Sequence, residues 1–174
     1  MEANYLTIIT LPVYCLDFNL TVSSVCWTSF SDQAEIIIVI SAEDIERNKI
    51  RGDLGITYDS DVLRLMNIYR DRGLYVGSVV ITKYSNQESA SLFKARLEKM
   101  GIRVYCHYLI AGYPTNIPVI VSENGYGKND YIETSRPLVV VTAPGPGKWQ
   151  NGCSASPSSS HELERGIRAG YAKL

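Results

Sequence analysis

A Pro/Gly-rich loop that carries a lysine is the part of the sequence best suited to bind an anion. The loop follows the apolar run Leu138–Val141 and contains Gly145, Gly147 and Lys148. Glycines let the backbone approach a ligand closely, and exposed N–H groups beside a lysine suit a phosphate group. We therefore expect Gly145, Gly147 and Lys148 to bind a phosphate or a similar anion.

The same loop matches only part of the phosphate-binding P-loop pattern, G-x-x-x-x-G-K-[ST]. Gly147 and Lys148 fit, but Thr142 stands at the first glycine position and Trp149 stands where a hydroxyl would bind magnesium. A plain turn after a strand is therefore the alternative interpretation of this loop.

Four further cations could contribute charge to the same ligand. Arg47, Lys49 and Arg51 lie close together in a loop that also contains glycines, and Lys128 lies in the polar segment 123–134. Clusters of cations are typical of phosphate sites. The alternative for the first three is a solvated turn with local ion pairs, such as Arg51 with Asp53.

The sequence assigns no catalytic residue and no cofactor. Asp53, Asp59 and Glu133 could act as acids or bases, but carboxylates at loop positions usually cap helices or face solvent. Cys106 and His107 are neighbours on an expected strand. Their side chains must point to opposite faces, so they cannot pair as nucleophile and base.

The candidate loops connect strands and helices with clear hydrophobic patterns. β-Branched runs predict buried strands, and apolar residues at helical spacing predict helices. The expected strands are 5–10, 20–27, 35–40, 77–82, 102–108, 118–122 and 138–141. Between them we expect helices at about 42–48 after an N-cap at Ser41, at about 60–72, and from the capping box Ser85–Glu88 to Gly101.

This alternation of strands and helices predicts an α/β fold with a mostly parallel, Rossmann-like sheet flanked by helices. The helix before Gly101 is expected to bury one apolar face against that sheet. Its members are Ala90, Leu92, Phe93, Leu97 and Met100.

Composition limits the classes of partner. The 174 residues are 45% hydrophobic, enough for one core, and 17 Lys/Arg against 18 Asp/Glu give a net charge of −1. So small a net charge creates no field that recruits nucleic acid or an anionic membrane. The 4 cysteines form no C-x-x-C pair and there are only 2 histidines, so no metal site is expected.

The distribution of apolar residues bears on localisation. No apolar stretch reaches about 18 residues, so no membrane span is expected. The N-terminus lacks the basic region of a secretory signal. Because free thiols also fit a reducing compartment, we expect a cytoplasmic protein.

Three blocks resemble an uncharacterised bacterial family known as domain of unknown function 1846. They are Asp44–Asp59, Gly125–Thr134 and Val139–Gly147, and the resemblance covers about residues 32–147 and 165–173. It implies an α/β domain within a protein several hundred residues long, and it implies no activity.

The sequence departs from that family after Gly147. Family members resemble Gly-Pro-Gly-Ser-Gly-Lys-Met followed by an amphipathic helix, whereas here Lys148–Ser160 contains Pro157 among serines. We expect a poorly specified segment at 1–31, an α/β domain at 32–147 that is incomplete at its C-terminus, and an irregular tail at 148–174. Two compensating frame shifts in a truncated fragment would explain this pattern.

Two hypotheses about function follow from the sequence. The first is a domain that binds a phosphorylated small molecule or a nucleotide at the ends of its strands. The second is a truncated, inactive fragment of a larger protein that acts only as an interaction or structural piece. Exposed apolar faces would then favour self-association.

Overall fold

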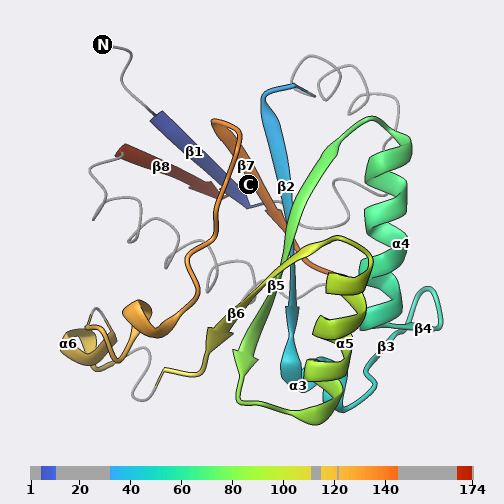
Figure 1. The fold of residues 1–174 in the computed structure, drawn as a ribbon, viewed down its shortest axis with the longest axis horizontal. Coiled ribbons are helices and arrows are strands. Elements are labelled where there is room, and N and C mark those ends of the chain that lie inside the picture. Colours follow the sequence, from blue (N-terminus) through green and yellow to red (C-terminus); the bar gives the residue numbers. More distant parts are fainter. Residues whose placement is uncertain (1–4, 11–31, 111–114, 121, 145–167, 174) are drawn as a thin grey trace.

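The computed structural model of the chain describes residues 5–10, 32–110, 115–120, 122–144 and 168–173. These residues form a six-stranded sheet in which all neighbouring strands are parallel (Figure 1). The strands are β1 (Tyr5–Thr10), β2 (Ala34–Ser41), β5 (Tyr75–Tyr84), β6 (Arg103–Tyr108), β7 (Leu138–Thr142) and β8 (Arg168–Lys173). Their order across the sheet is β6-β5-β2-β7-β1-β8.

Four strands of this sheet, taken in chain order as β2, β5, β6 and β7, have the Rossmann order 3-2-1-4. This confirms the expected parallel α/β fold. The β-branched run of β2 predicts a central strand, and every residue of that strand is buried.

Three helices cover one face of the sheet (Figure 1): α3 (Ala42–Glu46), α4 (Tyr58–Asp71) and α5 (Glu88–Lys99). Their buried apolar residues pack against alternate side chains of β2, those of Ile36, Ile38 and Ile40. The main members of this core are Ile36, Ile38, Ile40, Val62, Leu65, Met66, Tyr69, Val79, Ile81, Phe93 and Leu97. A short antiparallel hairpin of β3 (Ile50–Arg51) and β4 (Ile56–Thr57) lies between α3 and α4 in the chain.

The opposite face of the sheet has a smaller described core. Ile132, from the segment that leads into β7, packs there against apolar residues of β2, β5 and β7. Those residues are Ile37, Val39, Val80, Val139 and Val141. The alternation of β7 between the two cores confirms that this strand is buried on both faces.

Glycines follow the ends of two helices. Gly73 has a φ of 74° and follows α4, while Gly101 has a φ of 76° and follows α5. Both lie in the left-handed region, where a Cβ would be strained.

One expected strand is a helix. Residues 118–122 were expected to be extended, but Ile117–Ile120 form the short helix α6. The side chain of Asn116 accepts a 3.5 Å hydrogen bond from the Val119 N–H, and its carbonyl accepts the Ile120 N–H at 3.0 Å. An Asn cap and a proline in the first turn suit a helix start, and this local pattern outweighs β-propensity.

Details of α3 and α5 also differ from the sequence-based expectation. Ser41 and Gln87 stand at the N-cap positions, but neither side chain makes a cap hydrogen bond. The prediction of a capping box at Ser85–Glu88 is wrong. The side chain of Gln87, and not that of Glu88, accepts a hydrogen bond from the Ser85 N–H at 2.8 Å. On α5, Leu92 and Met100 are 66% and 52% exposed and do not belong to the buried face.

The sheet includes segments on both sides of the range 32–147. Tyr5–Thr10 forms the expected strand and pairs with both β7 and β8. Arg168–Lys173 forms β8, whereas the sequence predicts an irregular tail there. The expected strand at 20–27 lies outside the described residues. Within the described part of the chain, no helix is long and apolar enough to cross a membrane.

Candidate functional site

The strand order creates a topological switch point between β2 and β7. From β2 the chain proceeds to β5 and β6 on one side, and from β7 it proceeds to β8 on the other. Figure 1 shows α3 beginning directly at the carboxyl end of β2. In open parallel sheets the crevice for a ligand lies outside the carboxyl ends of the strands at such a point.

Hydroxyl groups lie at the carboxyl ends of the two strands that flank this point. Ser41 ends β2 and Thr142 ends β7, and they are 2% and 0% exposed. Neither hydroxyl has a hydrogen-bond partner among the described residues. Thr142 lies opposite Ile38, three residues before Ser41. Strand alternation also puts the two side chains on opposite faces of the sheet, Thr142 on the face of Val140 and Ser41 on the face of Val39, so the two hydroxyls do not form one polar group.

A charge pair lies on the β5 side of the switch point. Lys83 Nζ lies 2.9 Å from Glu43 Oε2, and joins the end of β5 to the first turn of α3. The two side chains are 47% and 42% exposed. Sequence analysis missed Lys83 because nothing in its neighbourhood marks it as different from other surface lysines.

The backbone at Lys83 is unusual. Its φ is 53°, in the left-handed region that non-glycine residues rarely adopt. The pairing of β5 with β6 also shifts register between Ile81 and Tyr84, where β5 has one residue more than β6. Such a bulge exposes Lys83 between two buried neighbours, Thr82 and Tyr84.

The structure gives Lys49 side-chain partners and places the backbone of Arg47 at the end of α3. Lys49 Nζ lies 3.1 Å from Asp44 Oδ1 and 5.0 Å from the centre of the Tyr58 ring. Arg47 occupies the C-cap position of α3, and its N–H donates to carbonyls of that helix.

Arg51 is buried in a network of carboxylates. Its Nη1 donates to Asp61 Oδ2 at 2.9 Å. Its Nε donates to Asp53 Oδ1 and its Nη2 donates to Asp53 Oδ2, each at 2.9 Å. Arg64 donates to the other oxygen of Asp61 at 2.7 Å. Burial opposes the charged form of Arg51, but its bonds to Asp53 and Asp61 outweigh burial and raise its pKa.

This network supports the turn interpretation of the basic loop. A side chain that is 3% exposed and held by two carboxylates has no surface left for a ligand. Asp53 is also unsuited to act as a base, because the hydrogen bond from Arg51 lowers its pKa below 3.8.

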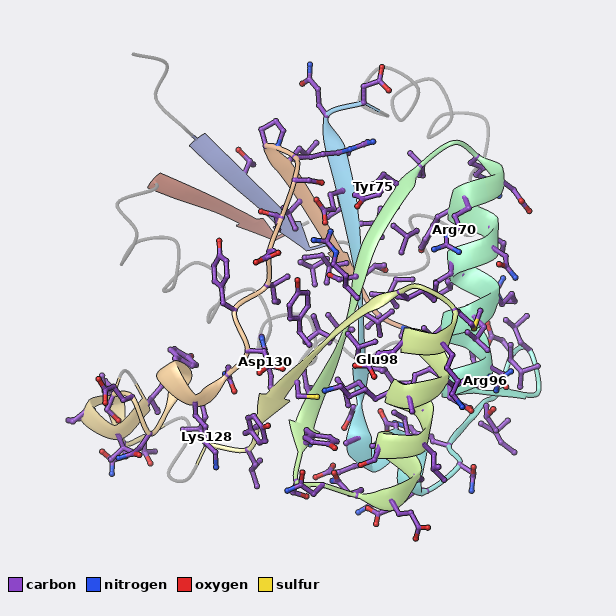
Figure 2. All side chains as sticks on the ribbon, viewed as in Figure 1. Arg70, Tyr75, Arg96, Glu98, Lys128 and Asp130 are labelled. Carbon is purple, nitrogen blue, oxygen red and sulfur yellow. The ribbon has the colours of Figure 1, made fainter. Side chains whose placement is uncertain are left out.

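Lys128 lies beyond β6, on the far side of β5 from the switch point. It belongs to the 3₁₀ helix η1 (Tyr126–Lys128), and its Nζ lies 5.0 Å from the centre of the Tyr108 ring. Figure 2 shows Lys128 and Asp130 on the side of β6 that faces away from α5. Lys128 therefore contacts β6, which β5 and β2 separate from β7 in the sheet.

The segment after η1 covers the edge of β6. Cys106 N–H donates to Asp130 Oδ2 at 2.7 Å, and Tyr108 N–H donates to Asn129 Oδ1 at 2.8 Å. The Asp130 N–H returns a bond to the Cys106 carbonyl at 3.2 Å. The polar segment 123–134 therefore has a structural role at this edge.

Cys106 is 1% exposed and packs in the core under α5. Burial raises the pKa of its thiol, although the positive charge of Lys94 opposes this. A thiol that stays protonated and inaccessible is not a nucleophile. Among the described residues, no group of three His, Cys, Asp or Glu side chains could hold a metal ion.

Gly145, Gly147 and Lys148 lie outside the described residues. β7 ends at Thr142, and Ala143 and Pro144 after it are buried.

These features define an α/β protein with a parallel, Rossmann-like sheet and a switch point at its carboxyl edge. The chain belongs to the family described as "Domain of unknown function DUF1846, N-terminal", whose profile matches residues 9–174. The match confirms the resemblance read from the sequence at about 32–147 and 165–173, and extends it to residues 9–31 and 148–164.

The chain is also similar to UPF0371 proteins of several bacteria. It is 56% identical to that of Streptococcus sanguinis (strain SK36), 54% to that of Fusobacterium nucleatum and 56% to that of Clostridium botulinum (strain Langeland), over 143 residues in each case. The alignments cover 82% of this chain but only 28–29% of the relatives. The chain thus spans less than a third of the length of these relatives.

Proposed function

We propose that the chain binds a phosphorylated small molecule or a nucleotide at the carboxyl edge of its sheet, beside the switch point between β2 and β7. The strand order is the observation that carries this proposal, because open parallel sheets bind ligands at such points. Gly145, Gly147 and Lys148 follow β7 in the sequence, and the loop after a strand begins at that strand's carboxyl end.

Two of the cations predicted from the sequence are left out of the proposed site. Arg51 is left out of the proposed site because its guanidinium is buried among carboxylates. Lys128 is left out because its ammonium group lies over Tyr108 of β6, and β5 and β2 lie between β6 and β7.

Isothermal titration calorimetry of the 174-residue chain tests the proposal. We expect saturable binding of ADP or a sugar phosphate and a loss of affinity in Lys148→Met, because an ammonium group binds phosphate as a point charge. Lys99→Met is the matched control, since Lys99 is exposed in the last turn of α5, away from the switch point. Absence of binding heat for every phosphate ligand, or equal losses in both variants, would refute the proposal.

A further inference from the structure

A tyrosine and two arginines lie at the amino ends of the strands, at the edge of the sheet opposite the proposed site. Tyr75 begins β5, Arg103 begins β6 and Arg136 lies two residues before β7. Figure 2 shows Tyr75 at the start of β5. β5 has 10 residues, so at about 3.3 Å per residue its two ends are about 30 Å apart. This edge is therefore separate from the proposed ligand site.

Both arginines contact the side chain of Tyr75. The guanidinium carbon of Arg136 lies 4.6 Å from the centre of the Tyr75 ring, a distance at which a cation and an aromatic face attract each other. Arg136 is itself anchored, because its Nη1 donates to the Ala34 carbonyl at 2.8 Å. At the hydroxyl end of the ring, Arg103 Nη2 donates to the Tyr75 oxygen at 3.3 Å. Positive charge is therefore concentrated around one tyrosine.

Arg103 is held loosely by the protein. Its contacts are with the carbonyl of Gly77 at 3.3 Å, the hydroxyl of Tyr75 at 3.3 Å and Oε1 of Glu35 at 3.4 Å. All three are longer than the usual N–H···O distance of about 2.9–3.0 Å. The buried Glu35 is held more closely by Ser135, whose N–H and hydroxyl donate to Oε2 at 2.7 Å and 2.9 Å. Arg103 therefore balances the charge of Glu35 while its side chain stays 39% exposed.

Two hydrogen-bond donors remain side by side at this edge. Among the described residues, Arg103 Nη1 has no acceptor, and the Tyr75 hydroxyl accepts a bond from Arg103 while its own proton has no acceptor. Tyr75 is 37% exposed, so a partner molecule can reach both groups. A carboxylate has two acceptor oxygens and suits such a pair of donors, one of which is charged. Tyrosine and arginine are also among the residues that contribute most binding energy at protein–protein interfaces.

We infer that this edge, formed by Tyr75, Arg103 and Arg136, is a docking surface for an acidic segment of a partner protein. A carboxylate of the partner, from an aspartate or a glutamate, accepts from Arg103 Nη1 with one oxygen and from the Tyr75 hydroxyl with the other. Arg136 keeps the Tyr75 ring in place and adds positive charge. The inference goes beyond the proposed function, because the two surfaces lie at opposite edges of the sheet.

The test is an NMR titration of the full chain with hexaglutamate, followed through the Arg103 Nε–H and Tyr75 ring signals. We expect saturable shifts of both signals, and none with hexalysine. Arg103→Lys should bind hexaglutamate about tenfold more weakly, because lysine keeps the charge but lacks the guanidinium fork. Tyr75→Phe keeps the ring and should bind about two- to tenfold more weakly, because one hydrogen bond is lost. Arg96→Lys, at an exposed arginine in the last turn of α5, is the matched control and should match the wild type.

Thermal unfolding of each variant without peptide checks that it is folded, and Tyr75→Phe leaves the charge beside Glu35 unchanged if Arg103→Lys is unstable. The inference is overturned if the Arg103 and Tyr75 signals do not shift, or if the Arg96 signal shifts as much as that of Arg103. Equal affinity of the wild type and a folded Arg103→Lys would overturn it too. Inorganic phosphate that binds at Arg103 as tightly as hexaglutamate would indicate a phosphate site, and would overturn the assignment to a carboxylate of a partner protein.

Discussion

The guanidinium of Arg51 and the carboxylate of Asp61 meet at 2.9 Å with side chains that are 3% and 0% exposed. The two residues come from the β3–β4 hairpin and from the first turn of α4. Arg64, three residues further along α4, donates to the second oxygen of Asp61. This pairing fixes the hairpin against the helix and removes Arg51 from the candidates for ligand binding.

Asp61→Ala is expected to destabilise the protein strongly. It would leave the buried Arg51 with the more exposed Asp53 as its described carboxylate partner. Loss of one partner of a buried pair typically costs about 3–5 kcal/mol. Urea denaturation followed by circular dichroism measures the change, and Asp53→Asn is the control, because Asp53 is 47% exposed. A smaller loss in Asp61→Ala than in Asp53→Asn would contradict this account.

Stability is expected to fall above about pH 9 because of the groups around Cys106. Burial raises the pKa of the Cys106 thiol, and burial followed by the charge of Asp130 raises the pKa of Tyr108. Each group holds its proton more tightly in the folded chain than in the unfolded chain. Their contribution is therefore complete below the unfolded pKa and is lost as the pH rises through the folded pKa.

The measurement is the free energy of unfolding between pH 7 and pH 11, from urea titrations. Each group contributes a slope of up to about 1.4 kcal/mol per pH unit. Cys106→Ala should lower stability at all pH values and should also make the decline above pH 9 less steep. The slope is the diagnostic quantity, since the lost sulfur contacts do not depend on pH. An unchanged slope would contradict the pKa shift of Cys106.

The sequence predicts the strands better than it predicts the partners of individual side chains. Runs such as 36–40 and 138–141 are recognisable as strands from the sequence, because a strand that is buried on both faces needs continuous apolar residues. The apolar residues of α5 are a weaker signal. A helix on a sheet buries a narrow stripe, so Phe93 and Leu97 are covered while Leu92 and Met100 are exposed.

The candidate site was partly predictable for a related reason. Arg51 and Asp53 are two residues apart, so their pairing could be proposed from the sequence. The contact between Lys83 and Glu43 joins residues 40 positions apart and depends on the bulge in β5. No local pattern encodes such a contact, because it arises only when the strands and α3 have packed together.

Gly77→Ala is expected to destabilise the amino edge of the sheet. A Cβ at this position would overlap the carboxylate of Glu35, which is 0% exposed. That carboxylate cannot move freely, because it accepts hydrogen bonds from the Ser135 N–H at 2.7 Å and from Arg103 at 3.4 Å. Overpacking of this kind costs about 1–3 kcal/mol.

Gly52→Ala is the matched control for that substitution. No atom lies within 4 Å of a Cβ at Gly52, and its φ is outside the left-handed region. The change should be neutral or stabilising by up to about 1 kcal/mol, because alanine restricts the unfolded chain. Chemical denaturation measures the free energy of unfolding of both variants. Equal changes in the two variants would show that the Glu35 side chain can move to make room for a Cβ at position 77.

Asp130 is expected to protect the edge of the sheet at β6. In the described sheet β6 is an edge strand, and exposed edges offer unpaired N–H groups to other chains. The Asp130 carboxylate accepts the Cys106 N–H at 2.7 Å, and Asn129 accepts the Tyr108 N–H at 2.8 Å. Hydrogen–deuterium exchange, resolved to single amides by NMR, reports on each bond separately.

Asp130→Ala should increase exchange of the Cys106 amide by roughly tenfold or more, since hydrogen bonds to charged groups contribute about 1.5–3 kcal/mol. Asp130→Asn keeps an acceptor oxygen and should preserve part of the protection. Asn129→Ala should affect the Tyr108 amide more than that of Cys106. If Asp130→Ala exposed both amides equally, the segment would be acting as one cooperative cover. The two side chains would then not be independent caps of the strand edge.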